Sequence, residues 1–205
     1  MLWRSCSDGL SLFSQGDTWT TGQLLPEGWT ECQIAEMKNG SILMTSRLQA
    51  KTPNHYRPNP DNTTGPLDKA NKRRAFARSD DGGHTWAELW YLADRQPEIQ
   101  RYESECAQGL ASDPATGVMY WAHPGGGIDG HDRMNGTLQR SHNGGAGWEF
   151  VEHIGEASMG YGYGDAHILK DGSVALAFQR TFDPPDHGIE GGGYDIALTI
   201  VKPGV

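Results

Sequence analysis

The hydrophobic residues of this chain gather in short segments that turn signals separate. These segments are rich in residues that favour β-structure, and they lie at 40–48, 73–79, 117–123, 136–141, 148–154, 172–180 and 194–201. Turn signals such as KNG, DPATG and KDG lie between them, and 28 glycines break the chain into short pieces. Helical periodicity is almost absent. The pattern predicts an all-β protein made of many short antiparallel strands.

One turn motif recurs along the chain. RSDDGGHTW at 78–86 and RSHNGGAGW at 140–148 share a serine, an acidic or amide residue, a glycine and a tryptophan at the same offsets. SQGDTW at 14–19 keeps the glycine, threonine and tryptophan but has Leu12 in place of the serine. An Asp or Asn side chain can hydrogen-bond its own following backbone, and glycine supplies positive φ. The motif therefore predicts a structural turn rather than a catalytic one.

The spacing of this motif indicates a repeat architecture. Its tryptophans, at 19, 86 and 148, lie 67 and 62 residues apart. Many short strands with a recurring tryptophan turn are typical of an antiparallel β-propeller. Within such a fold, the polar, Pro- and Asn-rich segment Gln49–Lys72 predicts a long loop between two strands of one blade.

A second internal similarity concerns chemistry. MKNGSILM at 37–44 matches LKDGSVAL at 169–176, and each predicts a hairpin followed by a second strand. Aligning the lysines of the two hairpins superposes two pairs of polar positions, Glu31 on Tyr163 and Arg47 on Gln179. The first strands of propeller blades line the central channel, so we expect these four side chains to face one pocket. The alternative is that the two pairs match by coincidence of register.

Composition narrows the classes of partner. The chain has 17 Lys and Arg against 26 Asp and Glu, and its net charge of −9 argues against a nucleic-acid partner. No apolar run approaches membrane-spanning length, and the opening MLWRSCSDGLSLF lacks the apolar core of a signal peptide. At 205 residues, the range 1–205 is expected to form one domain.

Neither the cysteines nor the histidines have the spacing of a metal site. The three cysteines, Cys6, Cys32 and Cys106, form no CxxC pair and predict reduced thiols rather than a disulfide framework. Three histidines also lack metal-binding spacing relative to one another, namely His123, His131 and His167. We therefore expect no metal and no other cofactor.

Three segments resemble exo-α-sialidases (neuraminidases). TECQIAEMKNGSILMTSR is similar to the segment in which a catalytic Glu precedes an active-site Arg, and Glu31 and Arg47 match these positions, 16 residues apart. DRMNGTLQRSHNGGAGW resembles the later segment in which an Arg, here Arg133, precedes a strand and an Asp box. GYGYGDAHILKDGSVALAF resembles the segment of the tyrosine nucleophile, and Tyr163 is the match.

The resemblance runs from about Thr18 to Lys202 and implies both fold and activity. It implies a six-bladed β-propeller of sialidase type, of which this chain carries about the last three blades. The recurring turns are then Asp boxes, near 12–19, 79–86 and 141–148. The implied activity is hydrolysis of terminal sialic acids from glycoproteins, oligosaccharides or gangliosides. The wording ECQIAE is slightly closer to animal-type enzymes.

The chemistry of sialic acid suits these residue types. Its anomeric carbon bears a carboxylate, so a neutral phenol such as Tyr163 approaches with less repulsion than an anionic carboxylate nucleophile would. A phenol ionises near pH ~10 and needs a base, which the resemblance assigns to Glu31. Arg47 and Arg133 would bind the substrate carboxylate through charge-assisted hydrogen bonds. Gln179 would also contact substrate, at a position where the family usually has a Glu.

The pattern also departs from the family. An arginine in an RIP-like motif and an Asp that acts as general acid belong to its N-terminal part, and no residue before Glu31 matches either. Two other classes of function therefore stay open. One is a sialic-acid-binding propeller without catalysis, and the other is a structural propeller or inactive fragment.

Overall fold

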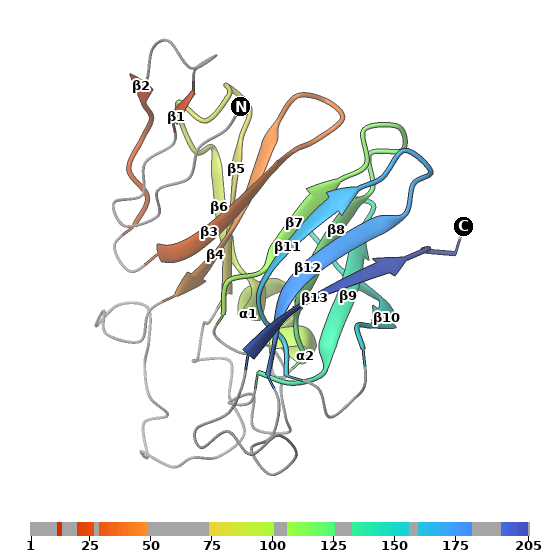
Figure 1. Cartoon of the computed structure of the whole chain (residues 1–205). Coiled ribbons are helices and arrows are strands. Elements are labelled where there is room, and N and C mark those ends of the chain that lie inside the picture. The colour runs from red at the N-terminus through yellow and green to blue at the C-terminus, as the bar shows by residue number, and fades with distance from the viewer. Residues whose placement is uncertain are drawn as a thin grey trace, which may run out of the picture.

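The computed structural model describes residues 12–13, 20–26, 29–48, 74–100, 106–125, 133–155, 160–181 and 194–204. Most of its strands belong to three antiparallel sheets that lie side by side (Figure 1). A separate strand pair joins β1 (Leu12–Phe13) to β2 (Thr20–Thr21). In each main sheet consecutive strands are hydrogen-bonded neighbours, so each sheet is a simple meander.

The strands of the three sheets have the following bounds. The first sheet contains β3 (Trp29–Glu36), β4 (Ile42–Leu48), β5 (Arg74–Ser79) and β6 (Glu88–Tyr91). The second contains β7 (Gly109–Ser112), β8 (Met119–Pro124), β9 (Gly136–Ser141) and β10 (Glu149–His153). The third contains β11 (Gly162–Ile168), β12 (Val174–Thr181) and β13 (Tyr194–Val201). Two short helices, α1 (Leu92–Arg95) and α2 (Pro97–Gln100), follow β6.

The first strand of each sheet lies innermost. Strand β7 packs against β3 on one side and against β11 on the other. A Cβ atom at Gly109 would lie 2.9 Å from backbone atoms of Asp165 and Ala166, so glycine permits this close approach of β7 and β11. Each sheet is therefore one blade, and the first strands converge as they do around a propeller axis. The predicted all-β propeller architecture is confirmed.

The core lies between the blades, and alternate residues of β8 face different neighbours. Met119 and Trp121 belong to a cluster shared with the first blade, which includes Phe76. Tyr120 and Ala122 belong to a cluster shared with the third blade. Because side chains of a strand alternate between faces, the middle blade is buried on both sides. Stacking of neighbouring blades is thus what stabilises the fold.

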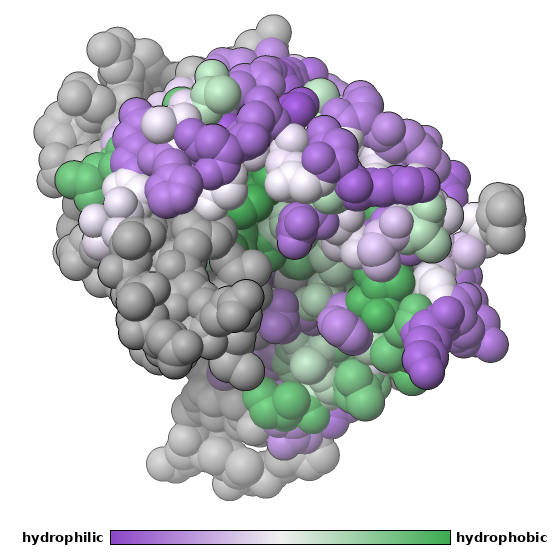
Figure 2. Space-filling view, turned by 90° about the horizontal axis from the view of Figure 1, so that it is seen from above, coloured by the Kyte–Doolittle hydropathy of each residue, from purple (hydrophilic) through white to green (hydrophobic). Residues whose placement is uncertain are grey.

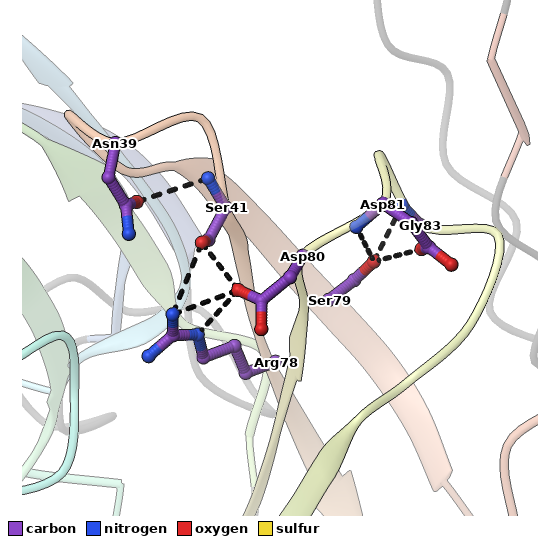
Figure 3. Close-up of polar contacts among 7 residues, drawn as sticks. All are labelled: Asn39, Ser41, Arg78, Ser79, Asp80, Asp81 and Gly83. Carbon is purple, nitrogen blue, oxygen red and sulfur yellow. Dashed lines mark hydrogen bonds and ion pairs between the residues drawn. The ribbon is translucent and has the colours of Figure 1, made fainter.

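The turn at 79–86 is satisfied locally, as the sequence predicts (Figure 3). The Ser79 hydroxyl accepts from the Gly83 N–H at 2.7 Å and donates to Asp81 at 2.8 Å. Asp81 also accepts from the backbone N–H and the hydroxyl of Thr85, at 2.8 and 2.6 Å. The tryptophan that ends the turn, Trp86, is buried.

The turn at 141–148 has nearly the same geometry without the charge. The Ser141 hydroxyl accepts from the Gly145 N–H at 2.9 Å and donates to Asn143 at 2.8 Å. Gly147 stands where the first turn has threonine, and its N–H donates to Asn143 at 2.8 Å. The related segment at 12–19 lies outside the described residues, apart from the strand β1.

The two hairpins that the sequence aligns are also equivalent in structure. The Met37 N–H donates to the Ser41 carbonyl at 2.7 Å, and the Leu169 N–H donates to the Ser173 carbonyl at 2.8 Å. Gly40 and Gly172 have nearly the same positive φ, 84° and 81°. The predicted repeat of a hairpin followed by a second strand is therefore confirmed.

Several elements are absent from the predicted set of apolar segments. They are the short strands β1 and β2, the three innermost strands, the short outer strand β6, and the helices α1 and α2. The predicted long loop, Gln49–Lys72, lies outside the described residues, although the flanking strands β4 and β5 are neighbours in one sheet. In the described part of the chain, neither helix has the length or hydropathy needed to cross a bilayer.

Candidate functional site

Glu31 and Tyr163 occupy the same position of two matching β-bulges. In the first blade, Thr30 pairs with Arg47 but the register then shifts, so that Gln33 pairs with Thr45. This leaves two residues of β3, the first of them Glu31, opposite one residue of β4. Because of this register shift, the Glu31 side chain does not follow the regular alternation of side chains between the two faces of β3.

The third blade repeats this arrangement. Gly162 pairs with Gln179, after which Asp165 pairs with Ala177, so that Tyr163 is the first residue of the bulge. The equivalences predicted from the repeat, Glu31 with Tyr163 and Arg47 with Gln179, therefore hold in the strand register.

Both bulge residues have a left-handed backbone. Their φ angles are 49° for Glu31 and 48° for Tyr163, a region that residues with a Cβ rarely adopt. Such a conformation costs about 1–3 kcal/mol and persists where the surrounding structure fixes it. Strain of this kind is concentrated at functional sites, which makes these two residues candidates for function.

Arg47 and Glu31 form an ion pair. Nη1 of Arg47 donates to Oε1 of Glu31 at 2.7 Å, and the two side chains are 20% and 26% exposed. In the described part of the chain, nothing hydrogen-bonds the buried second oxygen of this carboxylate, Oε2. Arg47 thus fixes the carboxylate through one oxygen and leaves the other available.

Arg133 lies over the ring of Tyr163. Its guanidinium carbon is 5.0 Å from the ring centroid, within the range of a cation–π contact. Burial by itself lowers the pKa of Arg133, but the ionisable groups of Cys106, Tyr163 and Glu31 around it together raise that pKa above its ordinary value. These groups therefore share one electrostatic environment.

Gly162 marks the point where several of these side chains meet. A Cβ atom there would lie 3.7 Å from the Cys106 sulfur, 3.7 Å from Oε1 of Gln179 and 4.0 Å from Cδ of Arg133. The structure thus brings Gln179 and Arg133 together beside Tyr163. It brings Arg47 directly to Glu31.

Of the two neighbouring tyrosines, only Tyr163 is accessible. Its side chain is 50% exposed, whereas Tyr161 is fully buried and stacks on Phe178 with ring centroids 4.7 Å apart. Burial strongly raises the pKa of the Tyr161 hydroxyl, so this phenol stays protonated. The local sequence GYGYG offers two tyrosines, and the fold presents one of them to the site.

Sequence reasoning missed two residues beside the site, Cys106 and Arg74. The Cys106 sulfur accepts the backbone N–H of Tyr163 at 3.2 Å, and Nη2 of Arg74 donates to the Cys106 carbonyl at 2.6 Å. Both residues are fully buried. No local motif marks them, because each contact joins positions far apart in the chain.

The histidines do not form a metal centre in the described part of the chain. His123 is buried and stacks on Trp121, with ring centroids 3.9 Å apart, and burial lowers its pKa to about 3. His167 lies on an exposed position of β11, and His131 lies outside the described residues. Among the described residues, no group of three His, Cys, Asp or Glu side chains is arranged to hold a metal ion.

Comparisons with known proteins identify the fold. No protein-family model matches the chain, and no curated protein sequence does. Among solved structures, the NanB sialidase of Streptococcus pneumoniae is 16% identical with a TM-score of 0.58, over 86% of this chain and 25% of that one. The Trypanosoma rangeli sialidase is 16% identical with a TM-score of 0.62, over 92% and 26%. The leech intramolecular trans-sialidase is 20% identical with a TM-score of 0.51, over 82% and 23%.

The chain therefore spans about a quarter of the length of these proteins. Similarity at such identities concerns the fold rather than the chemistry. Together with the three stacked meanders, it shows that the chain forms three blades of a sialidase-type β-propeller.

Proposed function

We propose that this chain carries the nucleophile, its base and two substrate-binding arginines of a retaining exo-α-sialidase. The observation that supports this most directly is the shared bulge of Glu31 and Tyr163, which have φ angles of 49° and 48° on two of the converging inner strands. Arg133 lies over the proposed nucleophile, and Arg47 binds the proposed base. One of the similar structures, the leech intramolecular trans-sialidase, was solved with the sialic acid derivative 2,7-anhydro-Neu5Ac, which supports a sialic acid as the ligand.

In the proposed first step, the Tyr163 oxygen attacks the anomeric carbon of the sialic acid. The bond from this carbon to the leaving oxygen breaks, the leaving oxygen takes up a proton from solvent, and the phenolic proton passes to the Glu31 carboxylate. In the second step water attacks the same carbon and releases one proton to solvent, and the tyrosine–sugar bond breaks. Tyr163 recovers a proton from Glu31, and the two displacements together retain the anomeric configuration.

The arginines would bind the carboxylate of the sugar. A guanidinium has five N–H donors, so Arg47 can hold Glu31 and a second carboxylate together. Arg133 lies beside Gln179, whose amide can hydrogen-bond a ligand but adds no charge. The proposed substrates are terminal sialic acids on glycoproteins, oligosaccharides or gangliosides.

The proposal is tested by covalent labelling of the chain. The probe is a sialic acid analogue with fluorine at the anomeric carbon and at its neighbour. Fluoride leaves as an anion, so labelling needs no general acid, and the second fluorine slows release of the sugar. Mass spectrometry of a digest should find the sugar on the peptide that contains Tyr163. Tyr163→Phe should abolish the label, and Glu31→Gln should slow labelling by about 10²–10⁴-fold.

A matched control is available two residues away. Tyr161→Phe removes a buried hydroxyl that faces no hydrogen-bond partner among the described residues, so the label should remain. If the analogue binds but labels no residue, the chain is a sialic-acid-binding propeller without catalysis. If it neither binds nor labels, the proposed function is wrong.

Ligand affinity tests the arginines separately. Arg133→Ala should weaken binding of an unreactive sialic acid analogue by about 10- to 100-fold, because a hydrogen bond to a charged group contributes about 1.5–3 kcal/mol. Arg140→Ala is the control, since Arg140 pairs with Glu149 on the outer strands of the second blade. Calorimetric titration measures both. Equal affinities for the two variants would argue against Arg133 as a carboxylate ligand.

A further inference from the structure

The bulge at Tyr163 removes its backbone N–H from the regular sheet. The ladder between β11 and β12 pairs Gly162 with Gln179 and resumes at Asp165, so Tyr163 lies between the two paired positions. Its N–H points instead to the Cys106 sulfur, 3.2 Å away. Cys106 precedes β7 and therefore reaches Tyr163 from the neighbouring blade.

Cys106 also contacts the first blade, through its backbone carbonyl. Arg74, on β5 of the first blade, donates from Nη2 to the Cys106 carbonyl at 2.6 Å. Arg74 is 0% exposed, and a buried guanidinium is costly unless its hydrogen bonds are made. It also lies directly opposite Arg47 in the ladder, where like charges repel. Such a placement calls for a role beyond packing.

The thiol suits this position because it is neutral. Burial raises the pKa of Cys106 despite the nearby guanidinium groups of Arg133 and Arg74, so the sulfur stays protonated at neutral pH. A neutral sulfur accepts the Tyr163 N–H without placing an anion beside Arg133. The phenol and its arginine therefore do not compete with a thiolate.

We propose that Arg74 and Cys106 are positioning residues for Tyr163, forming a relay of hydrogen bonds across three blades. Arg74 fixes the Cys106 backbone, and the Cys106 sulfur fixes the left-handed Tyr163 backbone under Arg133. That this serves a nucleophile rests on the sialidase proposal above. The relay itself is a statement about the Tyr163 backbone, so it can be tested without activity.

The first test measures amide hydrogen exchange of Tyr163 by NMR in the 205-residue chain. Cys106→Val keeps an apolar side chain of similar size but removes the acceptor. It should accelerate exchange of the Tyr163 N–H by on the order of tenfold or more, and Cys106→Ser should restore protection. Met119→Ala is the control, because it opens the core between the first two blades without touching the relay. Its effect on Tyr163 exchange should not exceed its effect on other β11 amides.

The second test measures the labelling rate by the fluorinated analogue. Cys106→Val should lower the maximal rate by about 10- to 100-fold with little change in analogue affinity, as expected for a misplaced reacting group. Cys106→Ser should stay near wild type, and Arg74→Lys should retain more of the rate than Arg74→Met. Thermal unfolding of each variant separates misfolding from misplacement.

The outcomes distinguish the two proposals. Unchanged Tyr163 exchange in a folded Cys106→Val variant overturns the relay, whatever the activity. Equal damage from the valine and serine variants also overturns it, since a purely structural thiol predicts that result. If exchange changes as expected while the wild-type chain takes up no label, the relay stands and the sialidase proposal fails.

Discussion

Glu31 and Tyr163 occupy equivalent positions in two blades: each is the first residue of a β-bulge, and their φ angles are 49° and 48°. Glycine is the usual residue in such a left-handed bulge position. A glutamate and a tyrosine at these positions indicate that their side chains are needed for function, despite the free-energy cost of a left-handed backbone. The inner strands of the first and third blades thus carry equivalent strained bulges, and the chain places a different chemical group at each.

Because of this backbone strain, glycine and alanine at position 163 should have the reverse of their usual order of stability in a strand. In an ordinary strand, glycine destabilises by about 0.5–1 kcal/mol relative to alanine. At a left-handed position the Cβ itself costs about 1–2 kcal/mol, so Tyr163→Gly should be more stable than Tyr163→Ala. Urea unfolding of both variants measures the difference.

The control lies three residues further along β11. Ala166 has no positive φ, so Ala166→Gly should destabilise the chain in the usual direction. If Tyr163→Gly is instead less stable than Tyr163→Ala, the left-handed backbone at this bulge is not strained.

Asp81 predicts a specific pH dependence of stability. Hydrogen bonds from the Thr85 hydroxyl, the Thr85 N–H and Ser79 lower its pKa from 3.8 to about 2. A lowered carboxyl pKa contributes stability above pH about 4, and this contribution is lost as the pH falls through about 2. Wild type should therefore lose unfolding free energy more steeply between these pH values than Asp81→Asn.

The second turn supplies the reciprocal variant. Asn143 accepts the same hydrogen bond from a serine hydroxyl, at 2.8 Å, but cannot titrate. Asn143→Asp should add acid sensitivity that wild type lacks at this turn. Identical slopes of unfolding free energy against pH for wild type and Asp81→Asn would show that the Asp81 charge does not contribute.

The outer strands and turns were predictable because their signals are local. Strand β4 follows the KNG turn, and strand β12 follows KDG, so apolar runs and turn residues mark both. The equivalence of Glu31 and Tyr163 followed from counting back from the same hairpin. Local chemistry and the repeat offset were sufficient for these features.

The inner strands were not predictable from hydrophobicity. Strand β11 reads GYGDAHI and exposes Tyr163, Asp165 and His167, and Asp165 lies in the same cross-strand row as the exposed Leu198. The relay could not be predicted from the sequence either, because Arg74 and Cys106 are 32 positions apart and Cys106 and Tyr163 are 57 positions apart. Such contacts exist only once the blades are stacked.

Gln96 forms a clamp, a pair of hydrogen bonds that joins the helical connection after β6 to the turn at 141–148. Its side-chain amide accepts from the Trp148 N–H at 2.6 Å and donates to the Trp148 carbonyl at 2.8 Å. Gln23 makes the first of these contacts with Trp86 in the preceding blade, at 2.9 Å. Gln96→Ala should destabilise the chain by about 1–3 kcal/mol, because two hydrogen bonds are lost.

Gln96→Glu separates the two hydrogen bonds. A carboxylate still accepts from the Trp148 N–H but cannot donate to its carbonyl, so the loss should be smaller than for alanine. Urea unfolding monitored by tryptophan fluorescence measures both variants. An alanine variant as stable as wild type would show that water replaces the clamp at no cost.

The outer face of the third blade predicts self-association of the 205-residue chain. Ile196, Leu198 and Ile200 of β13 are 80%, 70% and 55% exposed, and Leu198 pairs with the exposed Ala177 of β12. Figure 2 shows hydrophobic side chains at the surface between hydrophilic ones. In the described part of the chain, no strand pairs with the outer edge of β13, and such edges favour intermolecular pairing.

Sedimentation velocity over a range of concentrations tests this prediction. Wild type should form concentration-dependent oligomers, and the double variant Ile196→Lys, Leu198→Lys should shift the distribution towards monomer. Both positions are exposed, so the added charges remain in water and the fold should be kept. Phe150→Lys is the matched control, because Phe150 is 56% exposed on β10 of the second blade. A monomer at every concentration contradicts the prediction, and equal effects of the two variants would place the association elsewhere than on β13.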